Sequence, residues 1–231
     1  MKEVAWREGP DQLCFLTESL VPAAVDGRPP VLLLLGNPAP HSVLNGLPFS
    51  YEGNEREHRF WIALRETKFL DFGSNSERFD GWREQNQARK EALYSLNYDS
   101  PFRLGIVSYF SMPSPASAPT WAGVDGLRKL FAARHLREIA AAEETRIHEI
   151  VGEFQRGRGG ILALQRDAYE GLRRPTDPPY SRTAALESQL EARCNLNPTI
   201  LLIGAPPTRF MHGSAVSAAL SRARLRLMAN G

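Results

Sequence analysis

Four short and largely apolar runs, each bounded by glycine, proline or polar residues, mark the chain. They cover residues 31–35, 104–110, 160–164 and 199–203. Runs of this length without polar alternation are typical of strands buried on both faces of a parallel sheet. We therefore expect four strands at these positions.

The segments between and after these runs carry apolar residues at intervals of three and four, which predicts amphipathic helices. The expected helices are 59–70, 80–96, 124–131, 138–154, a short helix through Tyr169 and Leu172, and 214–228. Strands that alternate with helices predict an α/β fold with right-handed crossovers. The expected architecture is a three-layer α/β/α sandwich with a central four-stranded parallel sheet.

The whole pattern fits one domain, 1–231, because the composition does not shift along the chain. Segment 11–24 has apolar residues at near-helical spacing, so we expect an N-terminal helix there. A proline-rich connector and a helical stretch form an insert at about 175–193. Two roles for this insert stay open, a lid over a binding site or a plain surface addition.

Composition narrows the class of protein. Hydrophobic residues make up 42% and charged residues 23% of the 231 residues, as in ordinary globular proteins. No apolar stretch approaches the ~20 residues of a bilayer span, and the first residues lack a signal-peptide core, so we expect an intracellular, cytoplasmic protein with no membrane partner. A net charge of +2 is too small to indicate nucleic acid by itself. Cys14 and Cys194 are expected to be reduced, buried thiols, and no Cys/His cluster has metal-binding spacing, so we expect no metal and no cofactor.

The long segment after the first predicted strand is the first place to expect a binding site. It runs from Gly36 to Tyr51 and is rich in Pro, Gly, Ser, Asn and His. Ligands of parallel α/β sheets bind at the carboxyl ends of the strands, where this loop begins. The loop lacks the glycine patterns that bind phosphates or dinucleotides and the Gly-x-Ser-x-Gly nucleophile motif.

Three motifs in and after this loop carry a resemblance to a known family. They are Gly36-Asn37-Pro38, Gly46-Leu47-Pro48-Phe49 and Arg59-Phe60-Trp61. Together they resemble the first motif of uracil-DNA glycosylases and are most similar to the mismatch-specific branch, which is related to thymine-DNA glycosylase. Gly46 is expected at a turn with positive φ, and Phe60 and Trp61 in the core.

The resemblance continues along most of the chain, from Val31 to about Phe210. It includes the Pro113 loop after the second strand, Ala168-Tyr169-Glu170 after the third, and Leu202-Ile-Gly-Ala-Pro206-Pro207 in the place of the family's second motif. The sequence also departs from the family pattern. Ala39 and Gln165 stand where the family often has Gly, Ala205 where it has His or Asn, and Pro207 where it has Ser.

The resemblance implies a monofunctional DNA glycosylase of base-excision repair. Such an enzyme flips uracil out of DNA, with duplex favoured, and hydrolyses the N-glycosidic bond. Asn37 is the expected catalytic residue that positions the water, and His41 is expected to donate to a base oxygen or a phosphate. Phe49 is expected to stack on the flipped base. For His41, a merely solvated loop histidine remains an alternative.

Further contacts are expected around this centre. The substrate-binding set includes Gly36, Pro38, Ala39, Ser42, Phe49, Ser108 and Tyr109, and the DNA-binding set is Pro206, Pro207, Thr208, Arg209 and His212. Arg209 occupies the place of the family's apolar wedge, with an exposed arginine of no role as the alternative. Tyr109 either lines the base pocket or caps the core.

DNA that contains uracil or a related lesion is the expected partner, and we expect a monomer. Two other functions stay open. One is the same fold acting on hypoxanthine, ethenocytosine or mismatched thymine, since the divergent second motif leaves the width of the base pocket unknown. The other is a non-catalytic protein that binds DNA lesions, which Ala205 favours.

Overall fold

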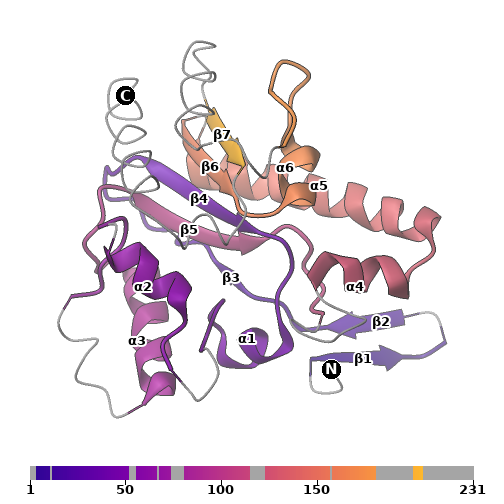
Figure 1. The fold of residues 1–231 in the computed structure, drawn as a ribbon, viewed down its shortest axis with the longest axis horizontal. Helices are drawn as coiled ribbons and strands as arrows, with labels where there is room; N and C mark the ends of the chain where they lie inside the picture. The colour runs from indigo at the N-terminus through magenta and orange to yellow at the C-terminus, as the bar shows by residue number, and fades with distance from the viewer. Residues whose placement is uncertain are drawn as a thin grey trace.

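The computed structural model describes residues 4–10, 12–51, 56–66, 68–73, 81–114, 123–156, 158–180 and 200–204. Its centre is a sheet in the order β3-β5-β4-β6-β7 (Figure 1). These strands are β3 (Ser19–Leu20), β4 (Pro30–Leu35), β5 (Arg103–Ser108), β6 (Gly159–Ala163) and β7 (Ile200–Gly204). All neighbours are parallel except β3, which runs antiparallel to β5 at one edge. The expected α/β class with a mostly parallel sheet is confirmed.

The four expected strands are β4, β5, β6 and β7, and the edge strand β3 is an addition to them. Strand β4 lies in the middle, and its Leu33 pairs with Ile106 of β5 and Leu162 of β6. All six residues of β4 are buried. The unbroken apolar run predicted this position because both faces of a central strand are covered.

Helices connect the strands. They are α1 (Pro40–Asn45), α2 (Arg59–Glu66), α3 (Trp82–Ser95), α4 (Gly123–Leu130), α5 (Ala133–Gln155) and α6 (Arg166–Leu172). All but α1 were expected, although α5 begins five residues earlier than its apolar spacing indicated. The helices expected at 183–193 and 214–228 lie outside the described residues. None of the helices in the described ranges is both long and apolar enough to span a membrane.

The N-terminal helix expected at 11–24 is wrong. The segment instead contains β2 (Gln12–Phe15), which pairs with β1 (Ala5–Glu8) in a hairpin, and then β3. Gly9 in the turn has φ of +77°, a conformation that favours glycine and lets the chain reverse. A short apolar run fits a helix or a strand equally well, and here cross-strand pairing decided. Cys14 lies on β2 and is only partly buried, contrary to expectation.

Two hydrophobic clusters form the core, one on each face of the sheet. Alternate residues of a strand point to opposite faces, so Leu33 and Leu35 join the cluster with α2 and α3. Leu32 and Leu34 join the cluster with α4, α5 and α6. We call these the α2/α3 face and the α5 face. A fully buried leucine contributes about 1.5–3 kcal/mol, so β4 stabilises both faces.

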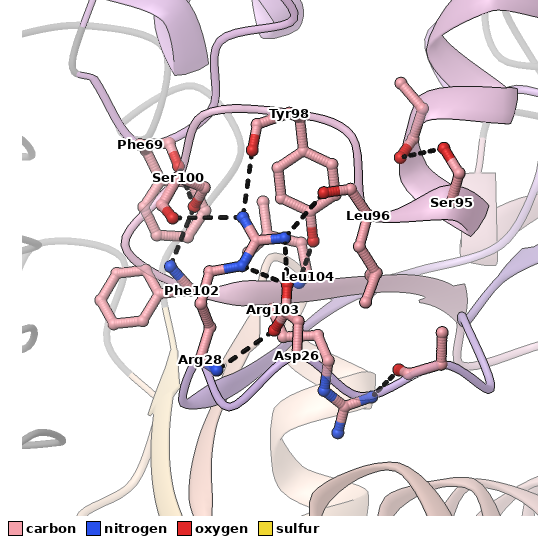
Figure 2. A network of polar contacts seen from close by, with 12 residues as sticks. Asp26, Arg28, Phe69, Ser95, Leu96, Tyr98, Ser100, Phe102, Arg103 and Leu104 are labelled. Atoms are coloured by element: carbon pink, nitrogen blue, oxygen red, sulfur yellow. Dashed lines mark hydrogen bonds and ion pairs between the residues drawn. The ribbon is translucent and has the colours of Figure 1, made fainter.

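A polar network closes the amino-terminal end of β4 and β5 (Figure 2). Arg28 donates to the carbonyl oxygens of Leu96, Tyr98 and Ser100 at 3.0–3.2 Å. Its guanidinium also lies 4.3 Å from the centre of the Tyr98 ring, and the Tyr98 hydroxyl accepts from the backbone N–H of Leu104 at 2.7 Å. These contacts tie the loop after α3 to the start of the sheet. The carboxyl end of the strands is where the expected site residues gather.

Candidate functional site

The loops that follow β4 and β5 are joined by a ladder of backbone hydrogen bonds. Tyr109 N–H donates to the oxygen of Leu35 at 3.0 Å, and Phe110 N–H to that of Gly36 at 2.9 Å. Further along, Ser114 N–H donates to the oxygen of Pro38 at 3.0 Å. The ladder extends the parallel pairing past the strand ends and fixes the position of the segment that contains Asn37.

The side chain of Asn37 is anchored across this junction. Its Nδ2 donates to Oγ of Ser114 at 2.6 Å. Ser114 is buried, with 1% of its surface exposed, whereas Asn37 is only partly buried. The contact occupies the nitrogen of the amide, and within the described residues nothing donates to the carbonyl oxygen Oδ1. Asn37 therefore presents a fixed hydrogen-bond acceptor at the carboxyl end of β4.

Helix α1 begins three residues after Asn37 and contacts α3. Pro40 occupies its first turn and Ala39 precedes it in an extended conformation. Ser42 is buried within the helix, and Pro38 is buried just before it. Gly46 ends the helix with φ of +64°, so the positive-φ turn expected there is confirmed.

His41 lies on α1 beside Tyr51, with ring centroids 5.3 Å apart. Burial lowers the pKa of the imidazole below its usual value. At neutral pH the ring is therefore uncharged and keeps one N–H donor and one acceptor nitrogen. Such a group can donate to a carbonyl oxygen without a permanent charge.

Phe49 is held in a strained backbone conformation. Its φ is +53°, which costs of order 1–3 kcal/mol for a residue other than glycine. The Trp61 indole N–H donates to the Phe49 carbonyl oxygen at 3.0 Å, and the Phe49 ring lies 4.3 Å from Phe60 and 4.9 Å from His58. Phe49 is only partly buried, so part of its ring surface remains accessible.

Helix α2 supplies this support because its aromatic residues are in the core. Phe60 is fully buried and Trp61 is 2% exposed, as expected. The guanidinium of Arg89 on α3 lies 5.6 Å from the Trp61 ring and forms an ion pair with Glu57. The Phe60 and Trp61 side chains of the Arg-Phe-Trp motif therefore support Phe49 from the core.

Ser108 is the last residue of β5 and Tyr109 follows it, and the two side chains lie on opposite faces of the sheet. Alternation along the strand places Ser108 on the α2/α3 face, since Ile106 belongs to that cluster. Tyr109 belongs to the α5-face cluster and is 3% exposed. Burial, with the nearby acids Glu144, Asp167 and Glu143, raises its pKa to about 12. Of the two roles left open for Tyr109, this placement favours the core residue.

Gly36 and Gln165 lie in close contact, and each has a structural reason for its residue type. A Cβ on Gly36 would lie 3.0 Å from Cγ of Gln165, so the glycine lets the two chain segments approach closely. Gln165 in turn caps α6, since its Oε1 accepts from the backbone N–H of Ala168 at 3.0 Å. The departure from glycine at Gln165 is therefore used as a helix cap.

Sequence reasoning missed Ser114 and Glu18. The serine follows Pro113 in a loop that the sequence marked, but only the tertiary structure brings it to Asn37. Glu18 is an isolated acid before β3 without any motif around it. The expected DNA-binding residues Pro206, Pro207, Thr208, Arg209 and His212 lie outside the described residues. No group of three or more potential metal ligands occurs within the described parts of the chain.

Comparisons with known proteins add no relative: no family model, curated protein or solved structure matches this chain.

Proposed function

We propose that this protein is a DNA glycosylase that removes uracil from DNA and leaves an abasic site. The anchored Asn37 amide is the observation that carries the proposal. It stands at the carboxyl end of the central strand β4, where α/β sheets bind ligands, and its orientation is fixed by Ser114. The finer architecture, a glycosylase-type α/β/α sandwich, belongs to the same proposal and is supported by the hydrophobic clusters on the two faces.

The reaction needs few protein groups. The N-glycosidic bond breaks with its electron pair leaving on the base, while the oxygen of water bonds to the sugar carbon C1′. The transition state is oxocarbenium-like, as in glycoside hydrolysis. The proton that the water loses is balanced by the one that the departing base nitrogen gains. No redox step is involved.

Asn37 has the role of positioning the water. A water molecule that donates to Oδ1 keeps a lone pair available for the sugar. An amide does not take up a proton at neutral pH, so Asn37 orients the nucleophile without acting as a base. Orientation of a reactant by a fixed group is a large source of catalysis.

Phe49 and His41 have roles toward the base. The strained φ of Phe49 is consistent with a functional position, because such strain is concentrated at binding sites. Stacking a base on an aromatic ring contributes about 1–3 kcal/mol. A neutral His41, favoured by burial, is suited to donate to a base carbonyl oxygen.

Base release from labelled duplexes tests the proposal. Each duplex contains one U·G, U·A, T·G or hypoxanthine pair, and abasic sites are read out by alkaline strand cleavage. We expect release by the wild type and a loss of about 10²–10³-fold in Asn37→Ala, comparable to removal of one preorganised catalytic group. The control is Asn97→Ala, on an exposed residue after α3.

The pattern of release decides between the functions. Release from only one non-uracil pair would assign that base instead. Release that persists at the wild-type rate in Asn37→Ala would remove Asn37 from the mechanism. If the wild type releases nothing from any pair but binds a lesion duplex tightly in a salt-dependent manner, the protein is a lesion binder and not an enzyme.

A further inference from the structure

Three buried polar side chains at the carboxyl end of the sheet make no hydrogen bond within the described structure. They are both carboxyl oxygens of Glu18 and the hydroxyl groups of Ser50 and Ser108. Their exposed fractions are 8%, 2% and 1%. Buried polar groups without partners destabilise the folded state, so they are rare in proteins unless a ligand or water satisfies them.

The sheet register brings Glu18 and Ser108 together. Leu20 of β3 pairs with Ile106 of β5, and Ser19 pairs with Val107. Continuing this antiparallel register by one residue places Glu18 opposite Ser108. Leu20 and Ile106 both belong to the α2/α3-face cluster, so Glu18 and Ser108 lie on that same face by alternation.

Helix α3 contacts β3 and α1 and links Ser50 to Glu18. Asn86 on α3 donates to the carbonyl oxygen of Ser50 at 2.7 Å, and Lys90 is the charged residue that interacts with Glu18. Asn86 and Lys90 are four residues apart, one turn on one side of the helix. Ser50 also follows Phe49 directly in the chain, which links these groups to the aromatic ring proposed to stack on the base.

We propose that Glu18, with Ser108 and Ser50 beside it, binds the hydrogen-bonding edge of the ligand that stacks on Phe49. The chemical class that fits is a planar heterocycle with an amide or imide edge, in which an N–H lies next to a C=O. A carboxylic acid pairs with such an edge through two parallel hydrogen bonds, one donated and one accepted. The assignment rests on the proposed glycosylase function and names the group that recognises its base.

The surroundings of Glu18 favour the neutral acid that this pairing needs. Burial raises the pKa of Glu18 to about 8, and the charge of Lys90 opposes the rise only in part. The amino group of Lys90 is directed to the end of α1, where it lies 2.7 Å from the position of a Cβ on Gly46. Ser108, opposite Glu18, carries no charge.

Two substitutions of Glu18 separate recognition from structure. Glu18→Leu removes the hydrogen bonds and also removes an unsatisfied buried group. We expect base release to fall at least about tenfold while the midpoint of urea unfolding stays equal or rises. Glu18→Gln keeps one donor and one acceptor, so it retains most of the release at pH 7 and lacks the decline that the wild type shows above about pH 8.

Free uracil supplies a readout that does not need catalysis. The Glu18 carboxyl carbon is followed by NMR while uracil is added, with 3-methyluracil, which lacks the imide N–H, as the matched control. We expect a shift with uracil and a much smaller one with 3-methyluracil. If the wild type releases no base, the glycosylase proposal fails, and the uracil titration alone decides the role of Glu18. Unchanged release in Glu18→Leu, or no carboxyl shift with uracil, would overturn this role.

Discussion

The end of β5 has a buried carboxyl group on each side, and the two differ in their hydrogen bonds. On the α5 face, Glu143 accepts from the N–H and the hydroxyl of Ser111, and from Nε of Arg146 at 2.6 Å. Arg146 then donates to the carbonyl oxygens of Ser108 and Tyr109 at 2.6 and 2.9 Å. On the α2/α3 face, Glu18 has no such partner among the described residues.

The contrast separates what holds the strand from what remains available to a ligand. A buried acidic group with complete hydrogen bonds is compatible with a stable fold, whereas one without hydrogen-bond partners raises the free energy of the folded state. On the α5 face, the hydrogen bonds of Glu143 and Arg146 hold the end of β5 in place. On the α2/α3 face, Glu18 and Ser108 retain their hydrogen-bonding capacity. Polar groups that are kept available for a ligand commonly lower the stability of the folded protein.

The largest expected effect is a difference in stability between Glu143→Leu and Glu18→Leu. Loss of Glu143 leaves Arg146 and Ser111 without their partner, so we expect the free energy of unfolding to fall by about 2–4 kcal/mol. Glu18→Leu should show no such loss. Urea unfolding at pH 7 measures both, and equal destabilisation by the two variants would refute the contrast.

The pH dependence of unfolding tests the state of Glu18 in the same comparison with Glu143. The folded-state pKa of Glu18 is about 8, above the 4.5 of an unperturbed glutamic acid. The folded protein therefore binds this proton more tightly than the unfolded chain, so stability falls as pH rises from about 4.5 to 8. Glu18→Gln should lack this decline when urea unfolding is repeated from pH 5 to 9. A wild type with the same pH profile as the variant would contradict the raised pKa.

A smaller effect is expected from Phe49→Leu, which removes the aromatic face and retains apolar volume. Binding to a lesion duplex should weaken by about 1–3 kcal/mol, the contribution of one base–aromatic stack. Fluorescence anisotropy with a labelled duplex measures the affinity. The matched control is Phe15→Leu, because Phe15 is a partly buried phenylalanine that packs against the opposite hydrophobic cluster. Equal weakening by both substitutions would indicate a general loss of structure.

The smallest effect is expected from Ser114→Ala. This change leaves Asn37 in place and removes the hydroxyl that orients its amide, a hydrogen bond that contributes about 1 kcal/mol. Base release should fall about fivefold, less than in Asn37→Ala. Ser95→Ala is the control, since its hydroxyl bonds a helix carbonyl oxygen on the exposed part of α3. A loss as large as that of Asn37→Ala would show that Ser114 contributes more than orientation.

Local sequence patterns were sufficient to predict the four parallel strands, five of the described helices, the glycine turn at Gly46 and the core positions of Phe60 and Trp61. These features follow from local rules: apolar periodicity and backbone conformational preference act over a few residues. The sequence also indicated Asn37 and Phe49 as a pair at one strand end, through a resemblance whose functional meaning remains a proposal.

The other features depend on contacts between segments that are far apart in the chain. The N-terminal segment became a hairpin and the edge strand β3 because strands β1 and β5 were available to pair with it. Ser114 reached Asn37 because parallel pairing joins the loops after β4 and β5. Glu18, Ser50 and Ser108 are widely separated in the chain, and register and helix packing bring them to one end of the sheet. Such long-range contacts depend on which surfaces meet, and no local pattern of residues encodes that.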